Sequence, residues 1–256
     1  MSSPDYPEYV PRNIAIWTKT NVEYTGPNAR SSWAREDVSW GIFVIPESQV
    51  GALGDVSGLD IVELGCGTAY FSAKLARLGA RPVGVDPTPA QLATAREMQA
   101  EFGLEFPLIE AAAEAVPLPD ATFDLALSEY GASIWADPYR WIPEAARLLR
   151  SGGRLVFLRN STLVTLCQTL AGATEQLQRP QNGLCRIDWP DTGETEFHLP
   201  PGELIDVLRK SGLAVERLVE LFAPEGAKDP VYYDYVTAEW ARKWPAEELW
   251  IARKTA

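Results

Sequence analysis

Short apolar runs alternate with helix-like stretches between Gly58 and Leu158. After each run, apolar residues recur every three or four positions, and this alternation is typical of βαβ units. The crossover in such a unit makes consecutive strands parallel, so the pattern predicts an α/β fold with a parallel sheet. The predicted strands are 59–64, 82–85, 106–109, 123–127 and 154–158.

Helix signals fill the intervals between these runs. Phe71, Leu75 and Leu78 stand at i, i+4 and i+7, and the following Gly79 supplies a left-handed stop. The segment 88–91, Thr-Pro-Ala-Gln, is a capping box with proline at the first helical position. The regular order of strands and helices therefore extends through this whole part of the chain.

Two regions depart from the alternation. Residues 1–57 hold several tryptophans among mixed helical and turn signals, and they predict an N-terminal helical and aromatic lid. Residues 159–198 follow the fifth strand with an apolar, helix-like stretch over 163–177 and then a polar segment. This region predicts a lid-like insertion.

The regular pattern resumes after the insertion. A helix is predicted over 202–211, and strands are predicted over 213–221 and 249–253. We therefore expect 58–256 to form one core domain, with the insertion inside it.

Composition excludes several classes of protein. The 256 residues carry a formal net charge of -12, whereas proteins that grip nucleic-acid backbones normally present dense lysine and arginine. Three widely spaced cysteines, without a CxxC or CxxH pair, predict neither a disulfide framework nor a metal site and favour a reducing compartment. No signal peptide is recognisable, and no apolar run reaches the roughly 20 residues of a membrane span. We expect a soluble cytoplasmic protein without nucleic-acid or membrane partners, whose oligomeric state stays open.

The ends of the predicted strands carry the candidate chemistry, because ligands of open parallel sheets bind beyond the carboxyl ends of the strands. Gly65 and Gly67 follow the first strand, and glycines let the backbone turn sharply and approach a ligand closely. Asp86 ends the second strand, where an acidic side chain can hold ribose hydroxyls. The two features together predict a nucleoside site.

These motifs resemble those of class I S-adenosylmethionine-dependent methyltransferases. The likeness is closest to the branch that includes ubiquinone- and menaquinone-type enzymes and many small-molecule methyltransferases. It runs in the family's order through Val62 to Thr68, Val83 to Asp86, Ala113 to Pro119 with Phe123-Asp124, and Arg147 to Leu155. The resemblance implies a Rossmann-like, seven-stranded, mostly parallel sheet flanked by helices, and S-adenosylmethionine as the cofactor.

The resemblance also assigns residues to the cofactor. The glycine turn would surround the methionine part, Asp86 would accept hydrogen bonds from the ribose, and Ala113 would offer its N–H to the adenine. The full cofactor-binding prediction comprises Glu63, Gly65, Cys66, Gly67, Asp86, Pro87, Ala113, Glu114 and Ser128.

Several of these positions have alternative roles. Glu63 is also placed to cap the following helix, whose N-terminus attracts negative charge. Cys66 has no histidine motif that would activate it, so we do not expect a nucleophile there. Ala112 stands where many relatives have an adenine-binding aspartate, and Glu114 is a possible substitute.

His198 and Glu129 are the predicted general bases, which the reaction needs only when the acceptor must lose a proton. A packing role is the alternative for His198. Aromatic residues are predicted to line the substrate pocket, or else to fill a hydrophobic lid. They are Tyr130, Trp135, Trp17 and Trp40.

The predicted function is methyl transfer from S-adenosylmethionine to a small-molecule acceptor by in-line displacement. One alternative is a non-catalytic partner protein that binds the cofactor. The other is a nicotinamide-dependent oxidoreductase, although Tyr70 stands where the GxGxxG/A fingerprint needs glycine or alanine. The sequence leaves the acceptor open.

Overall fold

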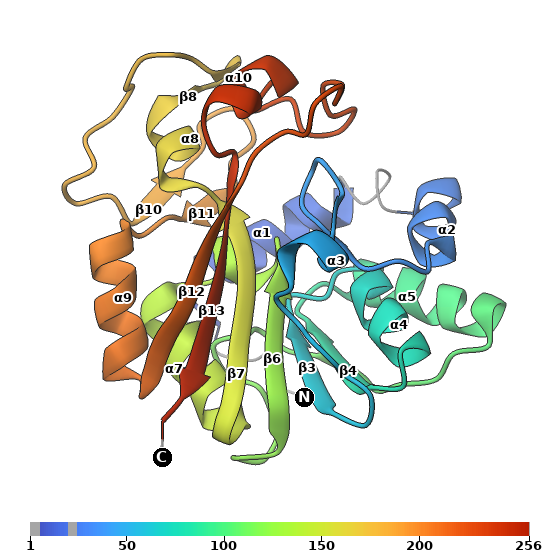
Figure 1. The fold of residues 1–256 in the computed structure, drawn as a ribbon. Coiled ribbons are helices and arrows are strands. Elements are labelled where there is room, and N and C mark those ends of the chain that lie inside the picture. Colours follow the sequence, from blue (N-terminus) through green and yellow to red (C-terminus); the bar gives the residue numbers. More distant parts are fainter. Residues whose placement is uncertain (1–5, 20–24, 256) are drawn as a thin grey trace.

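The computed structural model describes residues 6–19 and 25–255. Within them lies a sheet of seven strands in the order β12-β13-β7-β6-β3-β4-β5 (Figure 1). The strands are β3 (Asp60–Leu64), β4 (Arg81–Asp86), β5 (Leu108–Glu110), β6 (Phe123–Glu129), β7 (Leu149–Asn160), β12 (Leu213–Leu221) and β13 (Glu247–Lys254).

Parallel pairing joins β5, β4, β3, β6 and β7, and β13 runs antiparallel to both β7 and β12. This arrangement confirms the predicted Rossmann-like, mostly parallel sheet. Strand β7 is longer than the predicted 154–158, because Leu149 already pairs with Phe123 at the start of β6.

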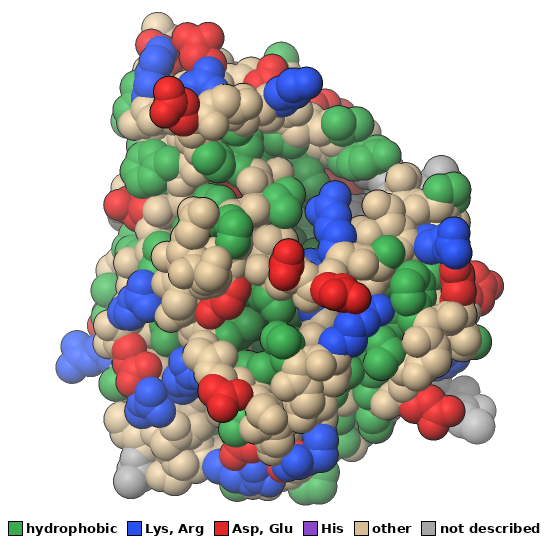
Figure 2. Space-filling view, turned by 45° about the vertical axis from the view of Figure 1, so that its right-hand side comes forward, with side chains coloured by type: hydrophobic (Ala, Val, Ile, Leu, Met, Phe, Trp, Pro, Cys, Tyr) green, Lys and Arg blue, Asp and Glu red, His purple; other side chains and the backbone are tan. Residues whose placement is uncertain are grey.

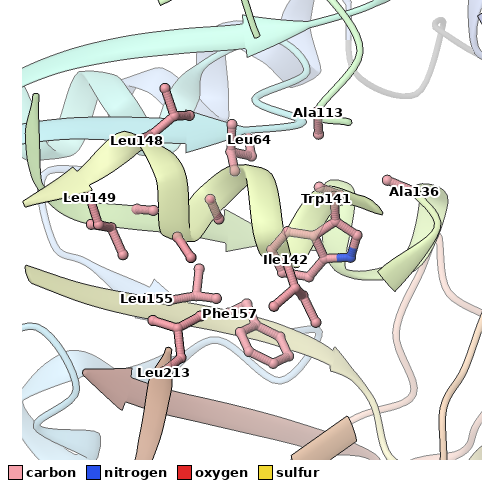
Figure 3. Close-up of a cluster of buried hydrophobic side chains, with 14 of the residues drawn as sticks. Leu64, Ala113, Ala136, Trp141, Ile142, Leu148, Leu149, Leu155, Phe157 and Leu213 are labelled. Carbon is pink, nitrogen blue, oxygen red and sulfur yellow. The ribbon is translucent and has the colours of Figure 1, made fainter. Parts of the chain in front are cut away.

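Helices cover both faces of the sheet, and alternate strand residues point to opposite faces. Val62 and Leu64 belong to a buried cluster with residues of α7 and α9, whereas Ile61 belongs to a second cluster with residues of α4. Figure 3 shows the first cluster, in which Trp141 and Ile142 of α7 lie beside Phe157 of β7. The helices of the core are α4 (Tyr70–Arg77), α5 (Pro89–Phe102), α6 (Ala132–Trp135), α7 (Pro138–Leu148), α9 (Pro201–Lys210) and α10 (Ala238–Lys243).

The segment after β7 differs from its prediction. The helix predicted over 163–177 is wrong beyond Cys167, because the chain turns into a short antiparallel hairpin. Gly172 in this hairpin has a φ of +103°, and a Cβ there would lie 3.0 Å from the carbonyl oxygen of Asp234. The elements of the segment are α8 (Thr162–Cys167), β8 (Gln168–Thr169), β9 (Gly172–Ala173), β10 (Arg186–Asp188) and β11 (Thr195–Phe197).

The described N-terminal part contributes to the core and adds a separate two-stranded sheet. Trp40, Ile45 and Val50 are buried in the cluster that contains Ile61 of β3. The predicted boundary at residue 57 stays a prediction. The elements are α1 (Tyr9–Lys19), α2 (Pro27–Ala34), β1 (Ser39–Trp40), β2 (Ile45–Pro46) and α3 (Glu47–Val50).

Charge is mixed over the surface drawn in Figure 2, where acidic and basic side chains are interspersed. In the described part of the chain, no helix combines the length and the apolar character that crossing a bilayer requires.

Candidate functional site

A cleft lies at the edge of the sheet where β3, β4 and β6 end, and Gly65 and Gly67 form its floor after β3. Their φ angles of +75° and +54° lie in the left-handed region that favours glycine. A Cβ at Gly65 would lie 2.5 Å from the backbone nitrogen of Ala132, so the turn and the start of α6 can meet only at a glycine. The turn therefore presents bare backbone to the cleft.

Asp86 fastens this turn from the end of β4. Its Oδ2 accepts a hydrogen bond from the N–H of Gly67 at 2.9 Å, and its Oδ1 accepts one from the N–H of Thr88 at 2.8 Å. Burial raises the pKa of Asp86, and the N–H donors of Thr88 and Gly67 oppose that rise. Because each carboxylate oxygen has a second lone pair, Asp86 can also accept hydrogen bonds from two neighbouring hydroxyls of a ligand.

Glu63 combines the two roles considered for it. Its Oε2 accepts hydrogen bonds from the backbone N–H and the hydroxyl of Ser72, so it holds the first turn of α4, and the residue also lines the cleft. Burial raises the pKa of Glu63 to about 8, and the nearby carboxylates Glu129 and Asp86 add to the effect. Cys66 beside it is buried too, and burial raises the pKa of its thiol. A thiol that resists ionisation is a poor nucleophile.

The wall beyond β5 contains Ala112, Ala113 and Glu114. The Glu114 carboxylate is already engaged, because its Oε1 accepts a hydrogen bond of 2.5 Å from the hydroxyl of Tyr9 in α1. Glu114 therefore ties α1 to the cleft, and the backbone and methyl groups of the two alanines face a ligand on this side.

Glu129 and Tyr130 stand where β6 ends. The hydroxyl of Tyr70 donates to Oε2 of Glu129, and burial raises the pKa of Glu129 while Tyr70 and Lys74 oppose the rise. Tyr130 has a φ of +51°, a costly conformation for a bulky residue. Its hydroxyl donates to Oε1 of Glu247 at 2.6 Å, which fixes its ring at the edge of the cleft.

Helix α1 forms the outer wall of the cleft, with Val10, Asn13, Ile14 and Trp17 among the lining residues. Trp17 packs edge-on against Trp135, with ring centroids 5.1 Å apart. The Asn13 amide donates to the carbonyl of Thr195 and accepts from its N–H, at 2.9 and 3.0 Å. These contacts hold α1 between the sheet edge and β11.

Most residues predicted for the site lie together in this cleft, and three lie elsewhere. His198 is 1% exposed and its Nε2 lies 2.8 Å from Oε2 of Glu196, outside the lining of the cleft. Trp40 is buried in the core, where its indole N–H donates to Glu47. Ser128 is buried and does not line the cleft, and its hydroxyl donates to the carbonyl of Leu64.

The cleft also contains residues that sequence reasoning missed, among them Thr68, Tyr70, Thr88 and Gln91. Gln91 Oε1 is buried without a hydrogen-bond partner among the described residues, and it is the atom nearest to a Cβ built on Gly67, at 3.8 Å. An unpaired acceptor beside a bare glycine turn and the Asp86 carboxylate suits a ligand rich in hydroxyl and amino groups, so these residues fit the predicted nucleoside cofactor. The sequence pointed to Gln91 only as the last residue of the capping box predicted over 88–91. That prediction is wrong, because no side chain caps the helix at Thr88 and the Thr88 N–H donates to Asp86 instead.

The family model and the curated relatives that match this chain are all methyltransferases. A family model described as a methyltransferase domain matches residues 62–157. Ubiquinone biosynthesis O-methyltransferase from Cereibacter sphaeroides (strain ATCC 17029) is 29% identical over 169 residues, which cover 65% of this chain and 65% of that protein. The corresponding protein from Ruegeria sp. (strain TM1040) is 30% identical over 170 residues, covering 66% of each. The chain thus spans just under two thirds of these curated relatives.

Solved structures agree on the fold. An S-adenosylmethionine-dependent methyltransferase from Mesorhizobium loti superposes with a TM-score of 0.65 at 25% identity, covering 83% of this chain and all of that one. A 1,6-didemethyltoxoflavin-N1-methyltransferase from Burkholderia thailandensis, solved with bound 1,6-didemethyltoxoflavin and S-adenosylhomocysteine, gives a TM-score of 0.56 at 14% identity and covers 100% of this chain and 94% of that one.

Proposed function

Because the chain belongs to the class I S-adenosylmethionine-dependent methyltransferases, we propose that it transfers a methyl group from S-adenosylmethionine to a small-molecule acceptor. The observation that carries the proposal is the glycine turn after β3, held by the Asp86 carboxylate, with the unpaired Gln91 beside it. The cofactor family and this donor and acceptor set point to the same ligand.

Different residues of the cleft would contact different parts of the cofactor. Asp86 would accept the ribose hydroxyls, and the bare turn at Gly65 and Gly67 would lie along the methionine part. The Ala113 side would face the adenine, with Glu114 acting through its bond to Tyr9 rather than as a free acceptor. Helix α1 would cover the bound cofactor and exclude water.

The cofactor, when bound, supplies an activated methyl group: an acceptor lone pair bonds to the methyl carbon, the carbon–sulfur bond breaks with its electron pair left on sulfur, and S-adenosylhomocysteine remains. The main task of the protein is then to hold the acceptor in line, which can supply roughly 7–11 kcal/mol of the barrier.

An acceptor hydroxyl or amine must also lose its proton. Glu129 is the carboxylate placed for this role, because it lines the cleft and its raised pKa brings it nearer to neutral pH. The hydroxyl of Tyr70 donates to Glu129 and so fixes the orientation of the carboxylate. His198, buried against Glu196, has no part in this proposal.

The remaining parts of the proposal concern partners and location. We infer a small-molecule acceptor without nucleic-acid or membrane partners, and a cytoplasmic location consistent with the free cysteines Cys66, Cys167 and Cys185. The alternative of a non-catalytic cofactor-binding protein predicts cofactor affinity without turnover, so formation of S-adenosylhomocysteine distinguishes it.

Asp86→Ala tests the cofactor site. The change removes charge-assisted acceptors for two hydroxyls, so S-adenosylhomocysteine should bind at least about tenfold more weakly, as measured by calorimetry. Glu105→Gln, an exposed carboxylate outside the cleft, should keep the affinity of the original protein. Because Asp86→Ala also leaves the N–H groups of Gly67 and Thr88 unpaired, Asp86→Asn and a circular dichroism spectrum serve as folding controls. Unchanged affinity in folded variants would refute the assignment.

A further inference from the structure

A second cavity adjoins the cofactor cleft and shares four wall residues with it: Tyr70, Glu129, Tyr130 and Tyr233. Its other walls come from α2, from α4, and from the residues around Gly41 and 230–232. A molecule in this second cavity would therefore lie next to the cleft and next to Glu129. This is the position that an acceptor needs.

Lys74 of α4 is the unusual side chain of this cavity. It is 3% exposed, yet its ammonium forms no hydrogen bond and no ion pair with any described residue, and it lies 5.4 Å from the ring centroid of Tyr70. Buried charges are normally paired, since removing an ion from water is costly. A buried ammonium that lines a cavity and has no such partner among the described residues is placed to pair with a bound anion.

Arg35 brings a second positive charge to the same cavity. Burial lowers the pKa of Lys74, and the charge of Arg35 lowers it further, whereas the carboxylates of Glu129, Glu63 and Asp37 raise it. Two like charges in one cavity repel each other, and a bound anion would relieve the repulsion.

Helix α2 presents a polar face to the cavity. Asn28, Ser31 and Ser32 line it, at spacings of three and four residues that place them on one side of the helix, and Arg35 lines it from the C-cap position just beyond the helix. The opposite side is anchored by Trp33, whose indole N–H donates to the carbonyl of Thr68 at 2.8 Å. The anchored helix therefore presents the hydroxyls of Ser31 and Ser32 to the cavity, and the exposed guanidinium of Arg35 stands at its end.

The wall opposite the polar face of α2 comes from the segment before α10, residues 230–233. The Tyr232 hydroxyl donates to Oδ1 of Asn28 at 3.3 Å, which links the segment before α10 to α2. The rings of Tyr70, Tyr130 and Tyr233 lie on the side shared with the cleft. The cavity thus has a cationic, hydroxyl-rich end and an aromatic end.

We propose that this cavity is the acceptor site and that it selects a small aromatic acid, whose anionic group, carboxylate or phosphate, lies between Lys74 and Arg35. The ring of the acceptor would pack among the tyrosines with its reacting atom toward Glu129 and the cleft. The assignment rests on the proposed methyl transfer, because it identifies the substrate class of that same site.

The overall charge of the chain makes the two basic side chains, Lys74 and Arg35, more significant. With a formal net charge of -12, the molecule repels anions at long range, so an anionic acceptor needs a local cationic site. Arginine and lysine flanked by hydroxyls are the groups that proteins use to hold carboxylates and phosphates.

Calorimetry on the full chain saturated with S-adenosylhomocysteine tests the site without turnover. Benzoate and phenyl phosphate are the anionic probes, and benzamide is the neutral probe of matched shape. We expect one or both anions to bind at least about tenfold more tightly than benzamide. The stronger of the two anions identifies the acid group.

Variants separate the site from general charge effects. Lys74→Met and Arg35→Gln should each weaken the preferred anion about tenfold and leave the affinity for S-adenosylhomocysteine within about twofold. Arg30→Gln, on the exposed face of the same helix, and Lys210→Met on α9 should change neither value.

Three results would overturn the inference: equal affinity for benzoate, phenyl phosphate and benzamide, no measurable binding of either anion, or full anion binding by Lys74→Met. Failure of the proposed function looks different, because the original protein would then not bind S-adenosylhomocysteine, or would bind it and methylate neither 3,4-dihydroxybenzoate nor any other small molecule, charged or neutral. Anion binding that depends on Lys74 would survive that second result as a property of the cavity.

Discussion

At the scale of single residues, buried carboxyl groups gather where the parallel strands end. Glu63, Asp86 and Glu129 each line the cleft, and each accepts hydrogen bonds from groups of its own chain. Burial raises the pKa of all three. A cationic ligand in the cleft would favour their ionised forms, so we expect cofactor binding near neutral pH to release a proton from Glu63, whose pKa is about 8.

Glu247 gives a pH dependence that stability measurements can detect. It is fully buried, its Oε2 has no partner among the described residues, and burial raises its pKa from 4.5 to about 7. Between these values the folded state holds a proton that the unfolded state has lost, so stability falls as the pH rises from 4.5 to 7. Relative to Glu247→Gln, the free energy of unfolding of the original protein should drop by roughly 3 kcal/mol across this window.

Urea denaturation at several pH values measures this difference. Glu220→Gln on β12, an exposed acid, should show a pH-independent offset from the original protein. If the offset for Glu247→Gln is equally flat, the carboxyl group titrates normally and the pKa argument fails.

At the scale of elements, the two N-terminal helices have separate tasks. Helix α1 borders the cofactor cleft and α2 borders the second cavity. Each has a side chain that hydrogen-bonds to backbone outside the N-terminal region, Asn13 to Thr195 and Trp33 to Thr68. Changes at these anchors should therefore affect one ligand more than the other.

Asn13→Ala tests this division for α1. The change leaves the N–H and carbonyl of Thr195 without their partner, and an unpaired buried backbone group costs about 1–3 kcal/mol. We expect faster hydrogen exchange over 9–19 and about tenfold weaker binding of S-adenosylhomocysteine, whereas exchange over 27–34 stays unchanged. Asn13→Asp keeps an acceptor for the Thr195 N–H and should show a smaller effect. Unaltered exchange in α1 would mean that its packing, rather than this pair, holds it.

At the scale of the whole molecule, the cofactor cleft and the second cavity share a wall, so their occupants should influence each other. S-adenosylmethionine carries a positive sulfur that S-adenosylhomocysteine lacks. An anion in the second cavity should therefore bind more tightly beside the methylated form, and linkage requires the reciprocal effect on the cofactor.

Phenyl phosphate measures this coupling. We expect its affinity to be several-fold higher with S-adenosylmethionine than with S-adenosylhomocysteine, with a difference that shrinks as salt is added. Benzamide, which has no charge, should show no such difference. Identical phenyl phosphate affinities in both complexes would argue that the anion lies too far from the sulfur for the two sites to be coupled.

The parallel sheet, the glycine turn and Asp86 could be predicted from the sequence because their signals are local. An apolar run, the glycines that follow it and an acid at the next strand end are set by neighbouring residues and by the pleat of each strand. The sequence also contains a signal for Lys74, since this lysine falls between Phe71 and Leu75 on the apolar face of its helix, where a charged side chain is unusual.

Which residues line the cleft and the second cavity was decided only by the tertiary structure. His198 follows the insertion in sequence, but the folding of that segment buries it against Glu196, away from the cleft. The second cavity unites α2, α4 and the segment before α10, which lie far apart in the chain. Local patterns determined the sheet and its ligand-binding edge, whereas the placement of these distant segments depends on packing between them, which no single stretch of sequence encodes.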